Sequence, residues 1–289
     1  MQYGMSLPNF NDFGSPRVLA QLARDAEDAG WDGFFIWDHM IFNGIPRPFA
    51  DPWVALAAAA VNTQRIRLGP LLTPLPRRRP WKLARETVSL DHLSGGRLIL
   101  GAGLGDPVKS EYGYFHEEAN IKTLAEKLDE GLEILTGLWQ AKPFTFQGKH
   151  YQLEEVTFLP APLQTPRIPI WIGGFWPNKP PFRRAARFDG VCPIGYDHEL
   201  SPKEWREILA YTLAQRSQPG PFDAVHIGST SGDPAQDHEI VTPYADAGVT
   251  WWIEDISPFR YGLGLDQPWP AEYTEKLKKR IHQGPPRVQ

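Results

Sequence analysis

The sequence predicts one α/β domain over residues 1–289, folded as a (β/α)8 TIM barrel. Strand-like and helix-like segments alternate in eight pairs, which favours parallel strands joined by helical crossovers. No Gly/Ser-rich or charged linker interrupts the series. The length of 289 residues also suits a barrel of about 250 residues with insertions. A closed barrel therefore fits better than a doubly wound sheet with a second domain.

Four strand–helix pairs make up the first half of the predicted barrel. Ser15-Pro16, Asp51-Pro52 and Pro80 mark the starts of three helices, because a capping side chain and a first-turn proline both favour a helix N-terminus. An excursion from Glu111 to Asn120 follows the fourth strand and is a candidate lid. The strands are predicted at residues 3–7, 33–37, 66–71 and 97–102, and the fourth helix carries the apolar positions from 124 to 139.

The second half begins with an inserted hairpin. Residues 144–153 alternate apolar and polar side chains around Gln147-Gly148-Lys149, which predicts two short antiparallel strands before strand five. The barrel therefore carries insertions after strand four and before strand five. The remaining strands are predicted at residues 170–172, 190–193, 224–228 and 250–254, with helices near 182–188, 202–216, 237–247 and 272–282.

The composition excludes several classes of protein. A net charge of −4 gives no electrostatic case for binding nucleic acid or an acidic membrane. Cys192 is the single cysteine, so an intramolecular disulfide and a zinc site built on several cysteines are excluded, and we expect no metal ligands. The longest apolar run, Trp53 to Val61, is too short to span a bilayer, and the first residues do not resemble a signal peptide. We expect a cytoplasmic protein.

Polar residues and glycines follow most of the predicted strands. In a (β/α)8 barrel the active site is built from the C-terminal ends of the strands and the loops after them. These positions hold Asp38 and His39 after strand two, Thr73 after strand three, Asp106 after strand four, Gly173 and Gly174 after strand five, Ser229 to Ser231 after strand seven, and Glu254 and Asp255 after strand eight.

Asp38 and His39 form the best catalytic pair among these residues. Histidine exchanges protons near neutral pH, and a neighbouring carboxylate can orient it or raise its pKa. Adjacent residues of a strand point in opposite directions, so we expect His39 to act while Asp38 supports the structure. Asp106 could present a carboxylate to a reacting carbon or to a proton acceptor, and a helix N-cap is the alternative role.

Two glycine-rich strand ends predict a bound cofactor. The segment Gly101–Asp106 lets a flat ligand approach the backbone closely. The segment at 173–178 precedes a helix with two arginines, so its amides and the helix N-terminus could hold a phosphate.

Five stretches of the chain carry a family resemblance. They are LGPLLTPLPRRRPWKLARETVSLDHLSGGRLILGAGLG, GWDGFFIWDHM, KLDEGLEILTGLW, FTFQGKHYQL and IPIWIGGFWPNKPPFRRAARFDG. With their order and spacing along the chain, these stretches resemble the bacterial luciferase-like oxidoreductases, which use FMN or the deazaflavin F420. The resemblance covers nearly the whole chain. Because the family is broad in substrate, it implies the fold and the class of cofactor more firmly than the reaction.

The resemblance assigns roles to particular residues. It places Asp38-His39 beside the deazaflavin, gives Asp106 a part in proton transfer, and places a non-prolyl cis peptide at Pro70-Leu71 behind the ring. Phe175-Trp176 stands where many relatives have small residues or serine. The cofactor-binding residues that it implies are Pro70, Leu71, Thr73, Gly103, Gly105, Gly173, Gly174, Phe175 and Trp176.

These inferences lead to one preferred function and three alternatives. The preferred function is hydride exchange between F420 and an organic substrate, with His39 and Asp106 handling protons. The first alternative is an FMN-dependent monooxygenase that uses reduced flavin and dioxygen. The others are a non-catalytic flavin-binding protein and a barrel hydrolase, which lacks support because no HxH pair follows strand one.

The loops predict the class of substrate, and the family resemblance implies the oligomeric state. Loops at 40–50, 106–120 and 256–270 are rich in aromatic residues and proline, so we expect an apolar or aromatic small-molecule substrate. Arg260 is the cation in these loops that could meet an anionic substrate. The family resemblance implies a homodimer.

Overall fold

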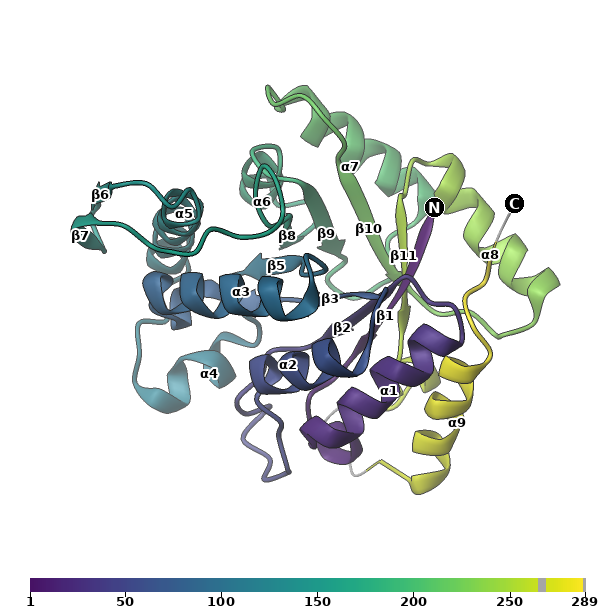
Figure 1. Cartoon of the computed structure of the whole chain (residues 1–289). Helices are drawn as coiled ribbons and strands as arrows, with labels where there is room; N and C mark the ends of the chain where they lie inside the picture. The colour runs from purple at the N-terminus through teal and green to yellow at the C-terminus, as the bar shows by residue number, and fades with distance from the viewer. Residues whose placement is uncertain (265–268, 288–289) are drawn as a thin grey trace.

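Strands and helices alternate along the chain and build a nearly closed barrel with helices outside it (Figure 1). The computed structural model describes residues 1–264 and 269–287. The elements of its first half are β1 (Gln2–Leu7), η1 (Asn11–Phe13), α1 (Pro16–Asp28), β2 (Gly33–Ile36), α2 (Pro52–Asn62), β3 (Arg67–Pro70), β4 (Thr73–Pro74), η2 (Leu75–Arg77), α3 (Pro80–Ser94), β5 (Leu100–Gly103), α4 (Val108–Glu111), η3 (Gly113–Phe115) and α5 (Ile121–Leu138).

The second half contains the inserted hairpin and four more strands of the barrel. The hairpin pairs its two strands antiparallel, and it lies beside α5 at the edge of the molecule (Figure 1). The elements are β6 (Phe144–Gln147), β7 (Gln152–Val156), β8 (Ile170–Phe175), α6 (Lys179–Ala185), β9 (Gly190–Ile194), α7 (Pro202–Ala214), β10 (Asp223–Gly228), α8 (Pro234–Asp246), β11 (Trp251–Asp255), η4 (Pro258–Tyr261) and α9 (Ala271–His282).

The order of the strands confirms the predicted barrel. In the part of the chain that the structure describes, one sheet has the order β3-β2-β1-β11-β10-β9-β8-β5-β4, and all neighbouring pairs are parallel. The Leu68 N–H donates to the Arg97 carbonyl (3.1 Å), and the Ile99 N–H donates to the Leu68 carbonyl (2.9 Å). These two bonds join β3 to the residues before β5 and nearly close the barrel.

The third barrel strand, predicted at residues 66–71, is observed as β3, and after a break it continues as β4, which the sequence did not predict. β3 pairs with β2, whereas β4 pairs with β5. The cis peptide bond lies in the interruption, between Leu71 and Leu72, and not at Pro70-Leu71 as the family resemblance implied. Pro70 is still paired with Ile36, so the backbone leaves the sheet after Pro70.

Proline starts three helices as predicted, and Asp51 caps one of them, whereas the Ser15 side chain makes no capping hydrogen bond to α1. Pro16, Pro52 and Pro80 each occupy the first position of a helix, where the missing N–H has no helical acceptor in any case. Asp51 caps α2, because its carboxylate accepts the N–H groups of Trp53 (2.9 Å) and Val54 (3.0 Å).

Three aromatic side chains fill the inside of the barrel. The ring centroids of Phe35, Trp171 and Trp251 lie 5.1 to 6.0 Å apart, and all three side chains are buried. The Trp171 indole N–H donates to Asp223 (2.9 Å), so the one polar atom of that ring is satisfied. This aromatic plug closes the barrel beneath the C-terminal ends of the strands.

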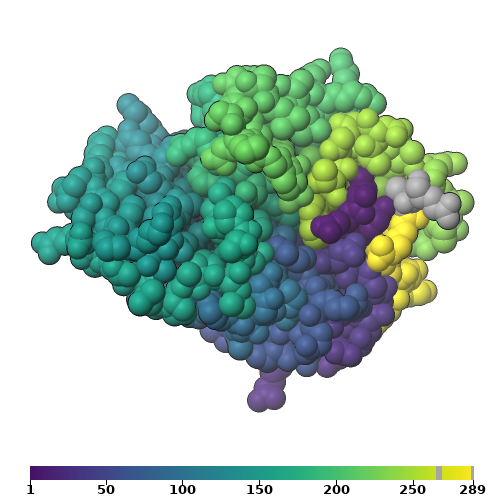
Figure 2. All heavy atoms as spheres, turned by 45° about the horizontal axis from the view of Figure 1, so that its top comes forward, coloured from purple at the N-terminus to yellow at the C-terminus, as the bar shows by residue number. Residues whose placement is uncertain are grey.

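The two ends of the chain meet on one side of the barrel. α9 lies beside α1 (Figure 1). Thr274 of α9 donates a hydrogen bond to Asp12. The N-terminal residues reach the surface beside the yellow C-terminal segment (Figure 2). α9 therefore completes the helical layer, as the sequence predicts. Among the described residues, no helix is both long enough and apolar enough to cross a membrane.

Candidate active site

A cavity of about 680 Å³ opens at the C-terminal ends of the barrel strands. Its wall includes residues from all eight strand positions of the barrel, as expected for the functional end of this fold. Nine of the predicted catalytic and cofactor-binding residues line it: Asp38, His39, Leu71, Gly103, Gly105, Asp106, Gly173, Gly174 and Phe175. Asp255, also expected at a strand end, lines it as well.

Leu71 and Leu72 form part of the cavity wall above the aromatic plug. A Cβ atom built on Gly173 would lie 1.8 Å from Leu72 Cδ1, and one built on Gly101 would lie 2.7 Å from Leu72 Cδ2. Gly103 would place its Cβ 3.2 Å from Leu72 Cδ1. Gly173 and Gly101 therefore leave room for the Leu72 side chain, and Gly101 also leaves room for the Pro70 carbonyl oxygen, which would lie 2.4 Å from a Cβ atom there. The sequence did not reveal this reason.

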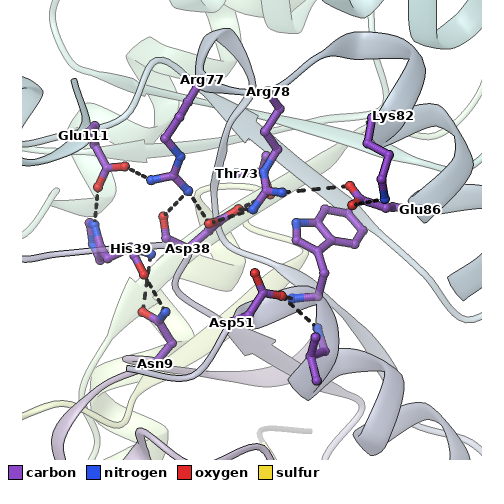
Figure 3. Close-up of polar contacts among 12 residues, drawn as sticks. Asn9, Asp38, His39, Asp51, Thr73, Arg77, Arg78, Lys82, Glu86 and Glu111 are labelled. Carbon is purple, nitrogen blue, oxygen red and sulfur yellow. Dashed lines mark hydrogen bonds and ion pairs between the residues drawn. The ribbon is translucent and has the colours of Figure 1, made fainter. Parts of the chain in front are cut away.

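Asp38 is the centre of a buried ion-pair network (Figure 3). Arg77 pairs with Asp38, and Arg78 donates to both carboxylate oxygens at 3.0 and 2.9 Å. The Thr73 hydroxyl donates to the same carboxylate (2.9 Å). Because its oxygens are already bound by these donors, Asp38 supports the structure, which is the role expected for one member of the Asp38-His39 pair.

His39 is held by a different carboxylate, that of Glu111 (Figure 3). His39 Nδ1 lies 2.6 Å from Glu111 Oε1, and Arg77 pairs with the other Glu111 oxygen. An ionised carboxylate can only accept a hydrogen bond, so Nδ1 carries the proton and Nε2 is left as an acceptor. Asn9 fixes the backbone of His39 by accepting its N–H (3.3 Å) and donating to its carbonyl (2.7 Å).

Glu111 was missed as a functional residue because it lies 72 residues from His39 in the sequence. The sequence assigned it to the start of a lid. Instead α4 turns the Glu111 side chain inward, where it is fully buried. No local spacing signals such a contact; the only hint is an acidic residue close after a glycine-rich strand end.

Asp106 lies in the cavity wall near His39 and Glu111. Partial removal from water raises the pKa of Asp106 above its ordinary value; the nearby His39 opposes this rise and the Glu111 charge adds to it. The Tyr112 hydroxyl donates to the Leu104 carbonyl and so anchors the loop that carries Asp106. In the structure Pro107, and not Asp106, is the N-cap of α4.

Aromatic side chains from the loops after β2 and β11 line the wall next to His39. The His39 and Phe42 ring centroids lie 5.0 Å apart, and Trp37 stacks with Phe259 at 6.1 Å. The Trp37 indole N–H donates to the Ser6 hydroxyl (2.9 Å). Trp37, Phe42 and Phe259 give the cavity an apolar wall beside an imidazole. Part of the expected substrate loop at 256–270, residues 265–268, lies outside the described residues.

Asp255 adds a second carboxyl to the cavity from the end of β11. Its Oδ2 atom accepts a hydrogen bond from the Ser257 hydroxyl (3.0 Å). Burial raises the pKa of Asp255 to about 6, although this hydrogen bond and the Arg260 charge act in the opposite direction. Strands β5 and β11 occupy the fourth and eighth positions of the barrel, so Asp106 and Asp255 come from opposite walls.

The segment after β8 divides between the cavity and the helical layer. Phe175 lines the cavity and stacks on Tyr196, with ring centroids 4.8 Å apart and planes inclined by 11°. Trp176 turns away and packs against Phe182, with centroids 5.0 Å apart. A Cβ atom on Gly174 would lie 2.2 Å from Pro181 Cβ. Gly174 therefore permits close packing of β8 on α6.

Several residues singled out from the sequence do not line the cavity, among them Glu254 and residues 229–231. Pro70 is paired in β3, Thr73 is bound to Asp38, and Trp176 is buried outside the cavity. Arg260, expected to meet a substrate, pairs instead with buried Glu254 (2.9 Å) and donates to the Asp255 carbonyl (3.0 Å). In the described residues, no group of three or more His, Cys, Asp or Glu side chains is placed to hold a metal ion.

Comparison with known proteins gives a family model and curated relatives. The model of the luciferase-like monooxygenase family matches residues 1–237. An F420-dependent glucose-6-phosphate dehydrogenase of Nakamurella multipartita is 33% identical over 167 residues, which are 56% of this chain and 48% of that enzyme. The match thus spans about half the length of that relative. An uncharacterized protein of Mycobacterium tuberculosis strain H37Rv is 32% identical over 240 residues, 81% of this chain and 75% of that protein.

Solved structures share the fold at lower identity. The F420-dependent tetrahydromethanopterin reductase of Methanopyrus kandleri has a TM-score of 0.75 at 19% identity and covers 98% of this chain and 96% of its own. An F420-dependent secondary alcohol dehydrogenase in complex with an F420-acetone adduct has a TM-score of 0.68 at 17% identity, with coverages of 98% and 84%.

An FMN complex also appears among the structural neighbours. It is the oxygenating constituent of 3,6-diketocamphane monooxygenase from Pseudomonas putida, with a TM-score of 0.62 at 22% identity and coverages of 84% and 71%. Curated relatives are thus named F420-dependent, and one structural neighbour holds FMN. With a family model that matches most of its length, this chain belongs to the luciferase-like monooxygenase family.

Proposed function

We propose that this protein is an oxidoreductase that transfers hydride between coenzyme F420 and an organic substrate bound in the barrel cavity. The observation that carries the proposal is the position of His39, which is oriented by Glu111 at the wall of a largely apolar cavity beside Asp106. The relatives that are named F420-dependent dehydrogenases support the choice of cofactor.

The size and the lining of the cavity support a deazaflavin ring as its ligand. Its volume of about 680 Å³ falls in the range of small-molecule sites. Leu71, Leu72 and Gly103 would hold one side of the ring, because the leucines offer an apolar surface and the glycine leaves the backbone accessible. When bound, the deazaflavin would supply the hydride chemistry, while the protein supplies position and electrostatics.

His39 and Asp106 would handle protons around the bound substrate. His39 Nε2 can accept a proton from a substrate hydroxyl, or return it, because Nδ1 is occupied by Glu111. The buried Glu111 carboxylate, itself paired with Arg77, stabilises the imidazolium that would form. Asp106 can exchange a proton at a higher pH than an ordinary aspartate, since its pKa is raised.

A second candidate function is an FMN-dependent monooxygenase. The structural neighbour with bound FMN favours this alternative. The two functions differ in their need for dioxygen. Oxygen uptake that depends on reduced FMN would support the monooxygenase, whereas anaerobic turnover of F420 would support the dehydrogenase.

Hydride exchange tests the preferred function. Purified protein is incubated anaerobically with F420 or reduced F420 and a panel of alcohols, aldehydes, ketones and unsaturated compounds, and the deazaflavin absorbance is followed. We expect turnover with at least one compound and a loss of about 100-fold or more in His39→Asn. Cofactor binding without turnover would favour the non-catalytic alternative. The homodimer, the cytoplasmic location and the apolar substrate stay predictions.

A further inference from the structure

We infer that this chain recognises the ring of its cofactor and makes no stabilising contact with the cofactor phosphate. This inference rests on the proposed function and holds for either F420 or FMN. Phosphate sites in barrels of this kind are built from backbone N–H groups in loops after the strands and at helix N-termini. The loops after β8 and β10 are candidates here because they run into the helices α6 and α8, and both are already filled by groups of the protein.

The loop after β8 has few N–H groups to offer. The Trp176 N–H donates to the Ile194 carbonyl (3.0 Å), and the Asn178 N–H donates to the Phe175 carbonyl (3.0 Å). Positions 177, 180 and 181 are prolines, which have no N–H. Among the described residues from 176 to 181, Lys179 alone keeps an N–H for a ligand. A phosphate cradle needs several converging donors, so this loop does not provide one.

The cations near this loop are directed elsewhere. Arg184 at the edge of the cavity forms a bidentate pair with Asp129, at 2.7 and 2.8 Å. Lys179 Nζ lies 3.6 Å from the centre of the Trp176 ring and 4.4 Å from that of Tyr211. The charge of Arg184 is neutralised by a carboxylate, and the Lys179 ammonium is held over aromatic rings of the helical layer.

In the loop after β10, a carboxylate occupies the place that a phosphate would take. The N–H groups of Ser231 (2.7 Å) and Gly232 (3.0 Å) donate to the Asp237 carboxylate, and so does the Ser231 hydroxyl (2.9 Å). The next donor back along the chain, the Thr230 N–H, is bound to Glu254 (3.0 Å). These N–H groups of the loop are therefore already bound to carboxylates of the protein itself.

The charges that remain in the cavity repel a phosphate. Asp106 and Asp255 line it from opposite walls, and neither has an ion-pair partner within 4.0 Å among the described residues. The apolar surface and the glycines around Leu72 instead suit a flat, uncharged ring. Ring contacts therefore provide the affinity that the structure offers to a flavin or deazaflavin.

Binding of matched ligands with and without phosphate tests this inference. The full chain is titrated with FMN and riboflavin, and with F420 and its phosphate-free 8-hydroxy-5-deazaflavin nucleoside, while the intrinsic tryptophan fluorescence is followed. We expect the dissociation constants within each pair to agree within about threefold, and to change little between low and high salt. Tighter binding of the phosphorylated member by about 30-fold or more would overturn the inference.

Two variants test the inference separately from the comparison of ligands on the wild-type protein. Pro180→Ala with Pro181→Ala restores two N–H groups, and we expect it to favour the phosphorylated member of each pair over wild type. Lys179→Ala should leave the ratio of the two dissociation constants within each pair unchanged. A loss of about tenfold in affinity for the phosphorylated members alone would show a phosphate contact and contradict the inference. If none of the four compounds binds, the proposed function fails and the inference fails with it.

Discussion

At the scale of single residues, the function of His39 depends on the carboxylate that orients it. The Nδ1 atom is bound to Glu111 at 2.6 Å, and Arg77 pairs with the other oxygen of that carboxylate. Nε2 is therefore the atom that would meet a substrate. The adjacent Asp38 carboxylate accepts a hydrogen bond from Thr73 and forms an ion pair with Arg78. It therefore plays no part in orienting the imidazole.

We predict that the imidazole of His39 is protonated on Nδ1 near neutral pH. The reason is that the Glu111 carboxylate only accepts hydrogen bonds. The 15N chemical shifts of the two ring nitrogens measure the tautomer directly. Glu111→Gln should give a mixture of tautomers, because an amide can donate or accept. A dominant Nε2–H form in the wild type would refute the orientation described.

A second prediction concerns Asp255, whose pKa is raised by burial from 3.8 to about 6. The folded protein holds this proton more tightly than the unfolded chain, so its contribution to stability is present below pH 4 and lost as the pH rises to about 6. Asp255→Asn should therefore raise the free energy of unfolding at pH 8 by roughly 1 to 2 kcal/mol and change it little at pH 4.

Urea unfolding at both pH values measures this effect. Asp246→Asn, at an exposed position of α8, serves as the matched control and should have no comparable pH-dependent effect. Equal stabilisation by Asp255→Asn at pH 4 and pH 8 would argue that removal of the buried charge is not the cause.

Sequence reasoning found the residues that lie at strand ends and missed those brought in from elsewhere. His39 and Asp106 follow strands and Gly173 lies near the C-terminal end of β8, so the rule for barrels placed them at the cavity. Glu111 and Arg77 reach His39 and Asp38 through tertiary contacts over 72 and 39 residues, respectively, and no local pattern encodes such contacts.

At the scale of elements, the third barrel strand is interrupted, and its interruption shapes the cavity. β3 and β4 pair with different neighbours, and Leu72 between them projects against Gly101 and Gly173. Proline at helix starts was readable from the sequence, because φ and the missing N–H are local properties. The interruption of the third strand could not be predicted from the sequence, since it depends on pairing with the strands on both sides.

We predict that Gly173→Ala destabilises the protein by about 1 to 3 kcal/mol, because the new methyl group would overlap Leu72 Cδ1 at 1.8 Å. Adding Leu72→Ala should recover part of that loss, so the double variant should be more stable than the sum of the single effects. Denaturant unfolding of the three variants gives the coupling energy. Gly113→Ala, where the new Cβ would meet Lys109 at 3.5 Å, is the control. Strict additivity would contradict the packing described.

At the scale of the whole molecule, the alternation of strands and helices was enough to predict the barrel. The family model and the F420-dependent structures support the same arrangement. The choice between F420 and FMN stays a proposal because relatives of both kinds share the fold. The barrel scaffold fixes where chemistry occurs, and the loops after the strands determine which chemistry.

The most direct measurement is an anaerobic titration of the purified protein with F420 and FMN, each oxidised and reduced, followed by tryptophan fluorescence. Trp37 lines the cavity and would report on a bound ring. We predict micromolar binding of F420 that is tighter than that of either form of FMN. Preferential binding of reduced FMN, followed by oxygen uptake when air is admitted, would contradict the assignment as a deazaflavin-dependent dehydrogenase.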